Sequence, residues 1–129
     1  MLDYGVNFVN SFLLMSFQSL GLHASLVEAA ASQQFTTPYP IQIEAIPAVL
    51  DGKDVLGIAK TGSGKTASYV LPILHQMLLP EARRNADHKG PSVLVLVPTR
   101  ELAQQVRGVF EEFINLLPDR IKSLAVFGG

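Results

Sequence analysis

The sequence predicts an α/β fold in which a parallel sheet is flanked by helices. Three short apolar runs, each typical of a buried strand, alternate with two long apolar-striped stretches typical of helices. This strand–helix–strand–helix–strand order is typical of a parallel sheet with right-handed crossovers. The third run ends beside the last residues of the chain, so we expect a sheet truncated after its third strand.

Length and composition agree with one domain that buries a hydrophobic core. The chain has 129 residues, of which 48% are hydrophobic and 16% are charged, and this composition disfavours disorder. The net charge is −1, so no overall basic field indicates nucleic acid, although a few local cations can suffice. The absence of cysteine excludes disulfides and thiolate metal sites, and the three histidines show no metal-ligand spacing.

Residues 1–14 differ in character from the rest and are interpreted as a leader before a domain at residues 15–129. The leader carries Asp3 and no Lys or Arg, so it lacks the basic start of a signal peptide. Its longest apolar run is too short to span a membrane. We therefore expect a cytoplasmic protein.

Two helices are predicted before the first strand. Residues 25–34 begin with a Ser-x-x-Glu pattern at Ser25, which is the signature of a capping box. Residues 38–52 place Pro40 at a favourable first helical position and end on a glycine. Pro47 should kink this second helix.

The rest of the chain divides at clear changes of pattern. The run SVLVLV is continuously apolar, which is typical of a strand buried on both faces. The best helix shows apolar residues at helical spacing, and the polar stretch EARRNADHKGP reads as a solvated surface loop. The predicted elements are strand 54–58, helix 65–79 bent at Pro72, loop 81–91, strand 92–97, helix 100–117 and strand 123–127.

The stretch AKTGSGKT, residues 59–66, has a composition that costs stability at the start of a helix. Gly62 and Gly64 each weaken a helix by about 1 kcal/mol, and Lys65 lies at the positive end of the helix dipole. A bound anion would offset both costs. The stretch matches the phosphate-loop pattern G-x-x-x-x-G-K-[ST] except that Ala59 replaces the first glycine.

In this interpretation backbone N–H groups from Gly62 to Thr66 converge on phosphate oxygens. Lys65 reaches the β- and γ-phosphates of a nucleotide, and the Thr66 hydroxyl ligates Mg²⁺. The expected nucleotide-binding residues of the loop are Ala59, Thr61, Gly62, Ser63, Gly64, Lys65 and Thr66. The alternative is a glycine-rich turn with an exposed lysine. Phosphate binding alone does not distinguish a kinase, transporter, GTPase or helicase.

Two further stretches narrow the class of protein. PTRELA follows the second strand, where sheets of this type bind ligands, and its Arg100 can serve a phosphate backbone or pair with Glu101 on the surface. FTTPYPIQ ends at Gln42, and Phe17 lies 25 positions before it. A Gln side chain can match the edge of adenine and a Phe ring can stack on a base. The alternatives are an exposed glutamine and a core phenylalanine.

Together these stretches resemble the DEAD-box ATP-dependent RNA helicases, specifically the first part of their N-terminal RecA-like domain. The Q motif of that family matches Phe35, Pro38, Ile41 and Gln42, with its upstream aromatic at Phe17. Motif I matches residues 59–66, motif Ia matches residues 98–103, and the GG element matches Gly128 and Gly129. The start MSFQSLGL looks most like the bacterial RhlE-type branch.

The resemblance implies a role for each matched residue. Gln42 would recognise adenine, Phe17 would stack on it, and Lys65 and Thr66 would hold the phosphates and Mg²⁺ of bound ATP as the catalytic residues. Contacts to the sugar-phosphate backbone of RNA, without sequence preference, would come from Pro98, Thr99, Arg100 and Gly129.

The sequence departs from the family pattern in two places. Gln34 stands where the family usually has Gly, which should alter a helix end rather than adenine recognition. No DEAD sequence occurs in the 129 residues, so we expect a helicase fragment with negligible hydrolysis of its own, whose parent protein unwinds RNA. A non-catalytic nucleotide-binding module and a DNA-acting motor remain the alternatives.

Overall fold

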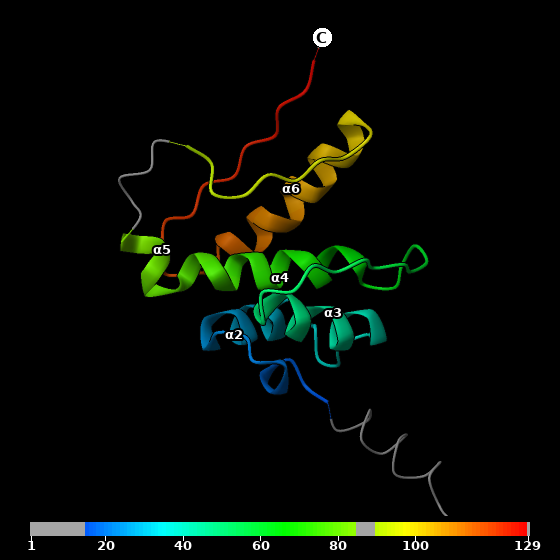
Figure 1. The fold of residues 1–129 in the computed structure, drawn as a ribbon, viewed down its shortest axis with the longest axis vertical. Helices are drawn as coiled ribbons and strands as arrows, with labels where there is room; N and C mark the ends of the chain where they lie inside the picture. Colours follow the sequence, from blue (N-terminus) through cyan, green and yellow to red (C-terminus); the bar gives the residue numbers. More distant parts are fainter. Residues whose placement is uncertain (1–14, 85–89, 129) are drawn as a thin grey trace, which may run out of the picture.

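The computed structural model describes residues 15–84 and 90–128, so the expected leader at residues 1–14 lies outside the described residues. The described chain is helical at six places (Figure 1). The elements are the 3-10 helix η1 Gln18–Leu20 and the α-helices α2 Ala24–Ser32, α3 Pro40–Leu50, α4 Lys65–Leu78, α5 Pro80–Arg84 and α6 Arg100–Ile114.

The four long predicted helices are confirmed to within a few residues at each end. The short helix α5 corrects one prediction, because it begins where the sequence indicated a solvated loop. α3 and α4 continue past Pro47 and Pro72, so neither proline ends its helix. No helix in the described ranges is long and apolar enough to cross a bilayer.

Helix α4 is the centre of the molecule, with α2 and α3 on one side of it and α6 on the other (Figure 1). Its apolar stripe is the reason for this position, since an amphipathic helix gains most stability when its apolar face is covered. The side chains that are fully buried come from all four long helices. They include Leu26 of α2, Ile46 of α3, Val70, Leu71 and Leu74 of α4, and Phe113 of α6.

The start of α2 differs from the prediction. The helix begins one residue earlier than Ser25, and His23 is its N-cap. The ring Nδ1 of His23 accepts a hydrogen bond from the Ser25 backbone N–H at 3.2 Å. Ser25 is therefore a donor inside the first turn, and the predicted capping box at this position is wrong because the imidazole supplies the acceptor.

The backbone at the end of α2 explains why the family usually has glycine at the position of Gln34. Gln34 has a φ of 64°, which makes it the one non-glycine residue with a positive φ in the described ranges. The residue that follows a helix often adopts this left-handed conformation, and glycine does so without steric cost. The position therefore favours glycine because of its backbone conformation.

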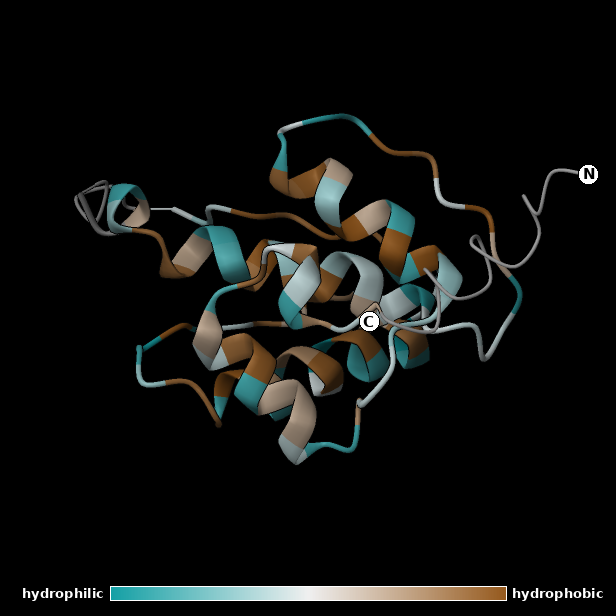
Figure 2. Cartoon of the chain, turned by 90° about the horizontal axis from the view of Figure 1, so that it is seen from below, coloured by the Kyte–Doolittle hydropathy of each residue, from teal (hydrophilic) through white to brown (hydrophobic). Residues whose placement is uncertain are grey.

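The predicted parallel sheet is absent from the described residues, none of which belongs to a hydrogen-bonded strand. The runs 54–58, 92–97 and 123–127 are extended, but they do not pair with one another. They carry hydrophobic stretches outside the helices (Figure 2). The prediction that 92–97 is a strand buried on both faces is also wrong for the described chain, because Leu94 and Leu96 are exposed. Pairing and burial of a strand require neighbouring strands at hydrogen-bonding distance.

Candidate nucleotide-binding site

The loop between the first extended run and α4 has the backbone of a phosphate cradle. Gly62 and Gly64 have φ values of 81° and 78°, a conformation that side chains rarely tolerate. The Lys60 carbonyl accepts the Ser63 backbone N–H at 3.2 Å and also the Ser63 hydroxyl, which closes the loop on itself. The first N–H groups of α4 have no intrahelical partner and suit an anion.

Gln42 connects helix α3 to this loop. Its side chain is completely buried. Its Oε1 accepts the backbone N–H of Tyr39 at 2.9 Å, and its Nε2 donates to the Gly64 carbonyl at 3.0 Å. The same carbonyl accepts the Ser68 N–H at 3.3 Å, which is the first hydrogen bond of α4. The predicted adenine-recognising residue therefore holds the junction between the phosphate loop and its helix.

Glycine is required at position 64 because a side chain would clash there, as well as because of the positive φ. A Cβ at this position would lie 2.7 Å from Cδ2 of Tyr39 and closer still to Nε2 of Gln42. Any side chain would push α3 away from the loop. The contact with Tyr39 was not predicted from the sequence, because nothing in the pattern distinguishes an N-cap tyrosine from a surface one.

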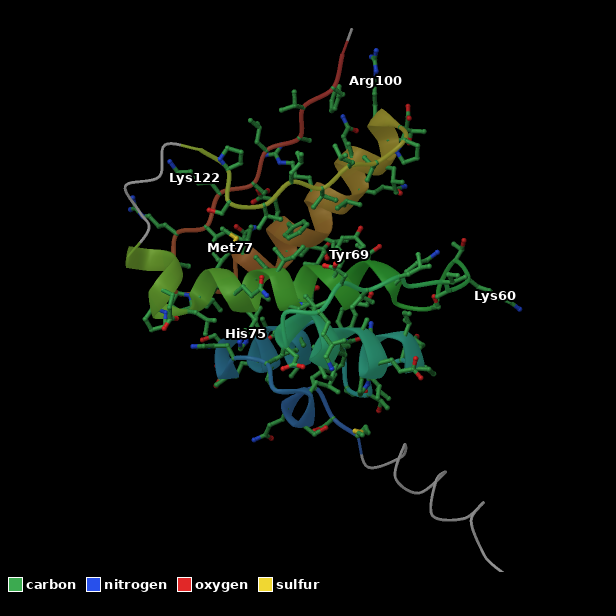
Figure 3. The ribbon with its side chains drawn as sticks, in the orientation of Figure 1. Lys60, Tyr69, His75, Met77, Arg100 and Lys122 are labelled. Atoms are coloured by element: carbon green, nitrogen blue, oxygen red, sulfur yellow. The ribbon has the colours of Figure 1, made fainter. Side chains whose placement is uncertain are left out.

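The two residues predicted to act on the phosphates open α4. Lys65 is exposed and Thr66 is half-buried in the first turn. Lys60, toward the outer end of the loop, projects away from the molecule (Figure 3). No group of three or more metal-ligating side chains occurs in the described residues.

Phe17, the predicted stacking residue, lies in the hydrophobic core. It is 3% exposed, and its ring meets that of Phe35 edge-on with a centroid distance of 6.2 Å. Phe35 in turn lies 5.9 Å from the ring of Phe113 in α6. The structure thus gives Phe17 the packing role that the sequence left open as an alternative, while stacking on adenine stays a prediction.

The predicted RNA-contacting residues lie at the start of α6. Thr99 is the N-cap, and its Oγ1 accepts the Leu102 N–H at 3.1 Å. Arg100 is exposed, forms no ion pair with any described residue, and has its Cζ 5.9 Å from the centroid of the Phe127 ring. The alternative of an ion pair with Glu101 is therefore not observed. Figure 3 shows Arg100 well apart from Lys60 of the phosphate loop. Gly129 lies outside the described residues.

A histidine pair that the sequence did not reveal joins the start of α2 to α4. The His75 Nδ1 accepts the backbone N–H of His23 at 2.9 Å, although 52 residues separate them. Partial burial lowers the pKa of His75, and the neighbouring His23 lowers it further. His75 lies on the side of α4 opposite Tyr69 and Met77 (Figure 3).

Comparison with known proteins shows the family of the chain. The model of the DEAD/DEAH box helicase family matches residues 39–129. The ATP-dependent RNA helicase DBP9 of Ajellomyces capsulatus is 59% identical over 109 residues, which cover 84% of this chain and 17% of that protein. The ATP-dependent RNA helicase DeaD of Buchnera aphidicola is 44% identical over 115 residues, 89% of this chain and 18% of that protein. The chain thus spans less than a fifth of the length of these relatives.

Two solved structures resemble the chain. The RNA helicase Prp28 from Chaetomium thermophilum, bound to ADP, gives a TM-score of 0.75 at 34% identity and covers 90% of this chain and 27% of its own. A DEAD box protein from Methanococcus jannaschii gives a TM-score of 0.65 at 35% identity. That match covers 77% of this chain and 25% of the other chain. Both are RecA-like helicase structures, which supports that fold in coarse form although the sheet is absent here.

The similarity also corrects one expectation. The assignment to a bacterial RhlE-type branch is wrong in detail, because a fungal DBP9 protein is 59% identical. The membership itself is confirmed by a match that covers most of the chain. This chain belongs to the DEAD/DEAH box helicase family.

Proposed function

We propose that this chain binds Mg²⁺-ATP where α3, the phosphate loop and α4 meet, and that the protein to which it belongs uses ATP to separate RNA duplexes. The hydrogen bond from Gln42 to the Gly64 carbonyl carries the proposal. It joins the residue expected to recognise adenine to the loop expected to hold phosphates. The names of the relatives support ATP and RNA, and the resemblance to an ADP-bound helicase supports a nucleotide site.

Each residue of the site would have a separate task. The Gln42 amide keeps one N–H and one Oε1 lone pair beyond its two internal hydrogen bonds. Once the buried side chain is uncovered, the N–H can donate to N7 of adenine and Oε1 can accept from the N6 amino group. Lys65 would place its ammonium on the β- and γ-phosphates, and Thr66 would offer its hydroxyl to Mg²⁺. A bound Mg²⁺ would neutralise phosphate charge. Phe17 would contribute a ring to the adenine side after a small opening of the core.

RNA would bind at the start of α6. Pro98, Thr99, Arg100 and Gly129 would face the sugar-phosphate backbone, where contacts position a strand without reading its sequence. The exposed Arg100 guanidinium, free of any ion pair among the described residues, supports this role. Replacement by Ala should weaken binding of single-stranded RNA and lower its dependence on salt by about 0.7 in log–log slope. Arg107, which pairs with Glu111 at 3.8 Å, is the matched control.

For the chain itself we propose nucleotide binding with negligible hydrolysis. The 129 residues contain no DEAD sequence, and phosphoryl transfer depends on positioned charges around the reacting phosphate. Strong RNA-stimulated release of phosphate by the purified chain would contradict this part of the proposal.

The binding claim is tested by titrating a fluorescent ATP analogue, with Mg²⁺, into two lysine variants. K65A should raise Kd about 10-fold or more, because a charge-assisted hydrogen bond to phosphate is lost. K60A should change Kd less than threefold, since Lys60 projects away from the molecule (Figure 3). Equal effects of the two changes would show general electrostatic attraction and would overturn the assigned site.

A further inference from the structure

The last extended segment, residues 123–127, lies along α6 and runs in the opposite direction to the helix (Figure 1). Two side-chain contacts hold it there. The Ser123 hydroxyl donates to Oε1 of Glu111, and the Phe127 ring faces the guanidinium of Arg100. Positions 100 and 111 are about 16 Å apart along a helix, and positions 123 and 127 are about 13 Å apart along an extended chain, so the two contacts fit together.

The alternation of side chains in this segment selects Phe127 for the second contact. Leu124 and Val126 are 80% and 82% exposed, whereas Ser123 and Ala125 are half-buried. Phe127 shares the side of Ser123 because side chains two apart in an extended chain lie on the same face. Its ring is 45% exposed, so the register brings it against the start of α6 without burying it.

Arg100 gains from such a contact because its position is otherwise unfavourable. It is the first residue of α6, where the positive end of the helix dipole disfavours a cation. Its side chain is exposed and forms no ion pair with any described residue, so no described carboxylate orients it. Figure 3 shows it projecting from the end of the helix. A long side chain of this kind loses rotamer entropy when it is fixed on a ligand.

The Phe127 ring can orient the guanidinium without neutralising it. Cζ of Arg100 lies 5.9 Å from the ring centroid, within the range of a cation–π contact, and guanidinium groups stack readily on aromatic faces. A carboxylate partner would cancel the charge and occupy N–H donors, as Glu111 does for Arg107 at 3.8 Å. The aromatic contact leaves both the charge and the donors for a phosphate.

Packing alone does not explain an aromatic residue at position 127. Phe113 of α6 fills the core and is fully buried, whereas Phe127 stays half-exposed. A side chain that only filled space would be covered, and leucine would fill that space as well. The ring face over the guanidinium is the feature that an aliphatic side chain lacks.

We propose that Phe127 is a positioning residue for the RNA site at the start of α6, where its ring holds the Arg100 guanidinium ready for a phosphate of single-stranded RNA. The inference rests on the proposed contact of Arg100 with RNA and adds the residue that orders this side chain. Order that exists before binding lowers the entropy lost on binding. Phe127 therefore acts on RNA affinity through Arg100.

The contact is tested first in the free chain, by NMR of the Arg100 side chain. The ring current of Phe127 should move the Arg100 side-chain proton resonances upfield. F127L should abolish this shift, because leucine keeps an apolar side chain but has no π face, and F127Y should preserve it. The ring is half-exposed, so the urea midpoint of F127L should stay close to that of the unchanged chain. Arg100 resonances that are the same in F127L would overturn the proposal.

The effect on affinity is measured by fluorescence anisotropy of a labelled oligouridine at low salt. R100A should raise Kd about 10-fold or more, because a charge-assisted contact is lost. F127L should raise Kd about two- to fivefold, the range of an exposed cation–π contact, and F127Y should restore the original Kd. In the R100A background F127L should have no further effect, because the ring acts through the guanidinium. R107A is the matched control for loss of a positive charge on α6.

The outcomes separate this inference from the proposed RNA site. Absence of RNA binding by the unchanged chain, or equal Kd values for R100A and R107A, would contradict the RNA site itself. If R100A weakens binding and F127L does not, the RNA site stands and the role of Phe127 is wrong. Additive effects of R100A and F127L, or a failure of F127Y to restore Kd, would likewise overturn the positioning role.

Discussion

Gln42 offers the sharpest test of how the site is held together. Replacing it by Met keeps a similar volume and flexibility, so little cavity or strain results. The change removes two hydrogen bonds, one from the Tyr39 N–H at 2.9 Å and one to the Gly64 carbonyl at 3.0 Å. Each contributes about 1 kcal/mol net. The Gly64 carbonyl keeps its bond from the Ser68 N–H, so the expected loss of unfolding free energy is about 1–3 kcal/mol.

The assay is equilibrium unfolding in urea, followed by circular dichroism, with an unchanged denaturant slope as the sign that only stability changed. Gln76 is the matched control, because its Nε2 donates to the Val49 carbonyl between the same two helices, but at 3.4 Å and on an exposed side chain. Q76M should change the unfolding free energy by less than about 0.5 kcal/mol. A similarly small effect for Q42M would show that this amide does not hold α3 to the loop.

Three further substitutions, at the end of α2, at the start of α6 and in the histidine pair, should change the stability of the chain. Q34G should raise the unfolding free energy by about 0.5–1 kcal/mol in the same assay, because glycine removes the steric cost of the φ of 64°, and Q34A should give no gain. T99V should cost about 1 kcal/mol through loss of the α6 cap, and T99S should restore most of it. The lowered pKa of His75 means that the unfolded chain binds the proton more readily, so stability should fall as pH drops below 6.5, the ordinary value. H75Q, which does not titrate, should flatten the difference in urea midpoint between pH 7 and pH 5, and an unchanged difference would contradict the assignment.

The helices could be predicted because their apolar residues repeat with a local period. The cap of α2 could not, since the choice between His23 and Ser25 depends on the ring nitrogen reaching a particular N–H. The left-handed residue after α2 could have been inferred from the glycine that the family usually has at Gln34, because helix ends often require that conformation.

The residues of the candidate site could be named from the sequence, but the contacts between them could not. The pattern of residues 59–66 identified the loop, and the Q motif identified Gln42, yet the hydrogen bond between Gln42 and Gly64 spans 22 residues. Spacing alone also could not place the Phe17 ring in the core or on a base. The prediction of a sheet was wrong for the described residues for a related reason. Strand pairing is a non-local property that depends on which neighbouring strands are present.

The nucleotide site is tested most directly by calorimetric titration of the chain with Mg²⁺-ATP and with Mg²⁺-GTP. Selective binding of ATP is expected, because the phosphate loop holds either nucleotide while Gln42 matches the edge of adenine alone. Equal binding would leave the phosphate loop in place and contradict the role of Gln42. Binding of neither nucleotide would contradict the proposal that α3, the loop and α4 form a nucleotide site in this chain.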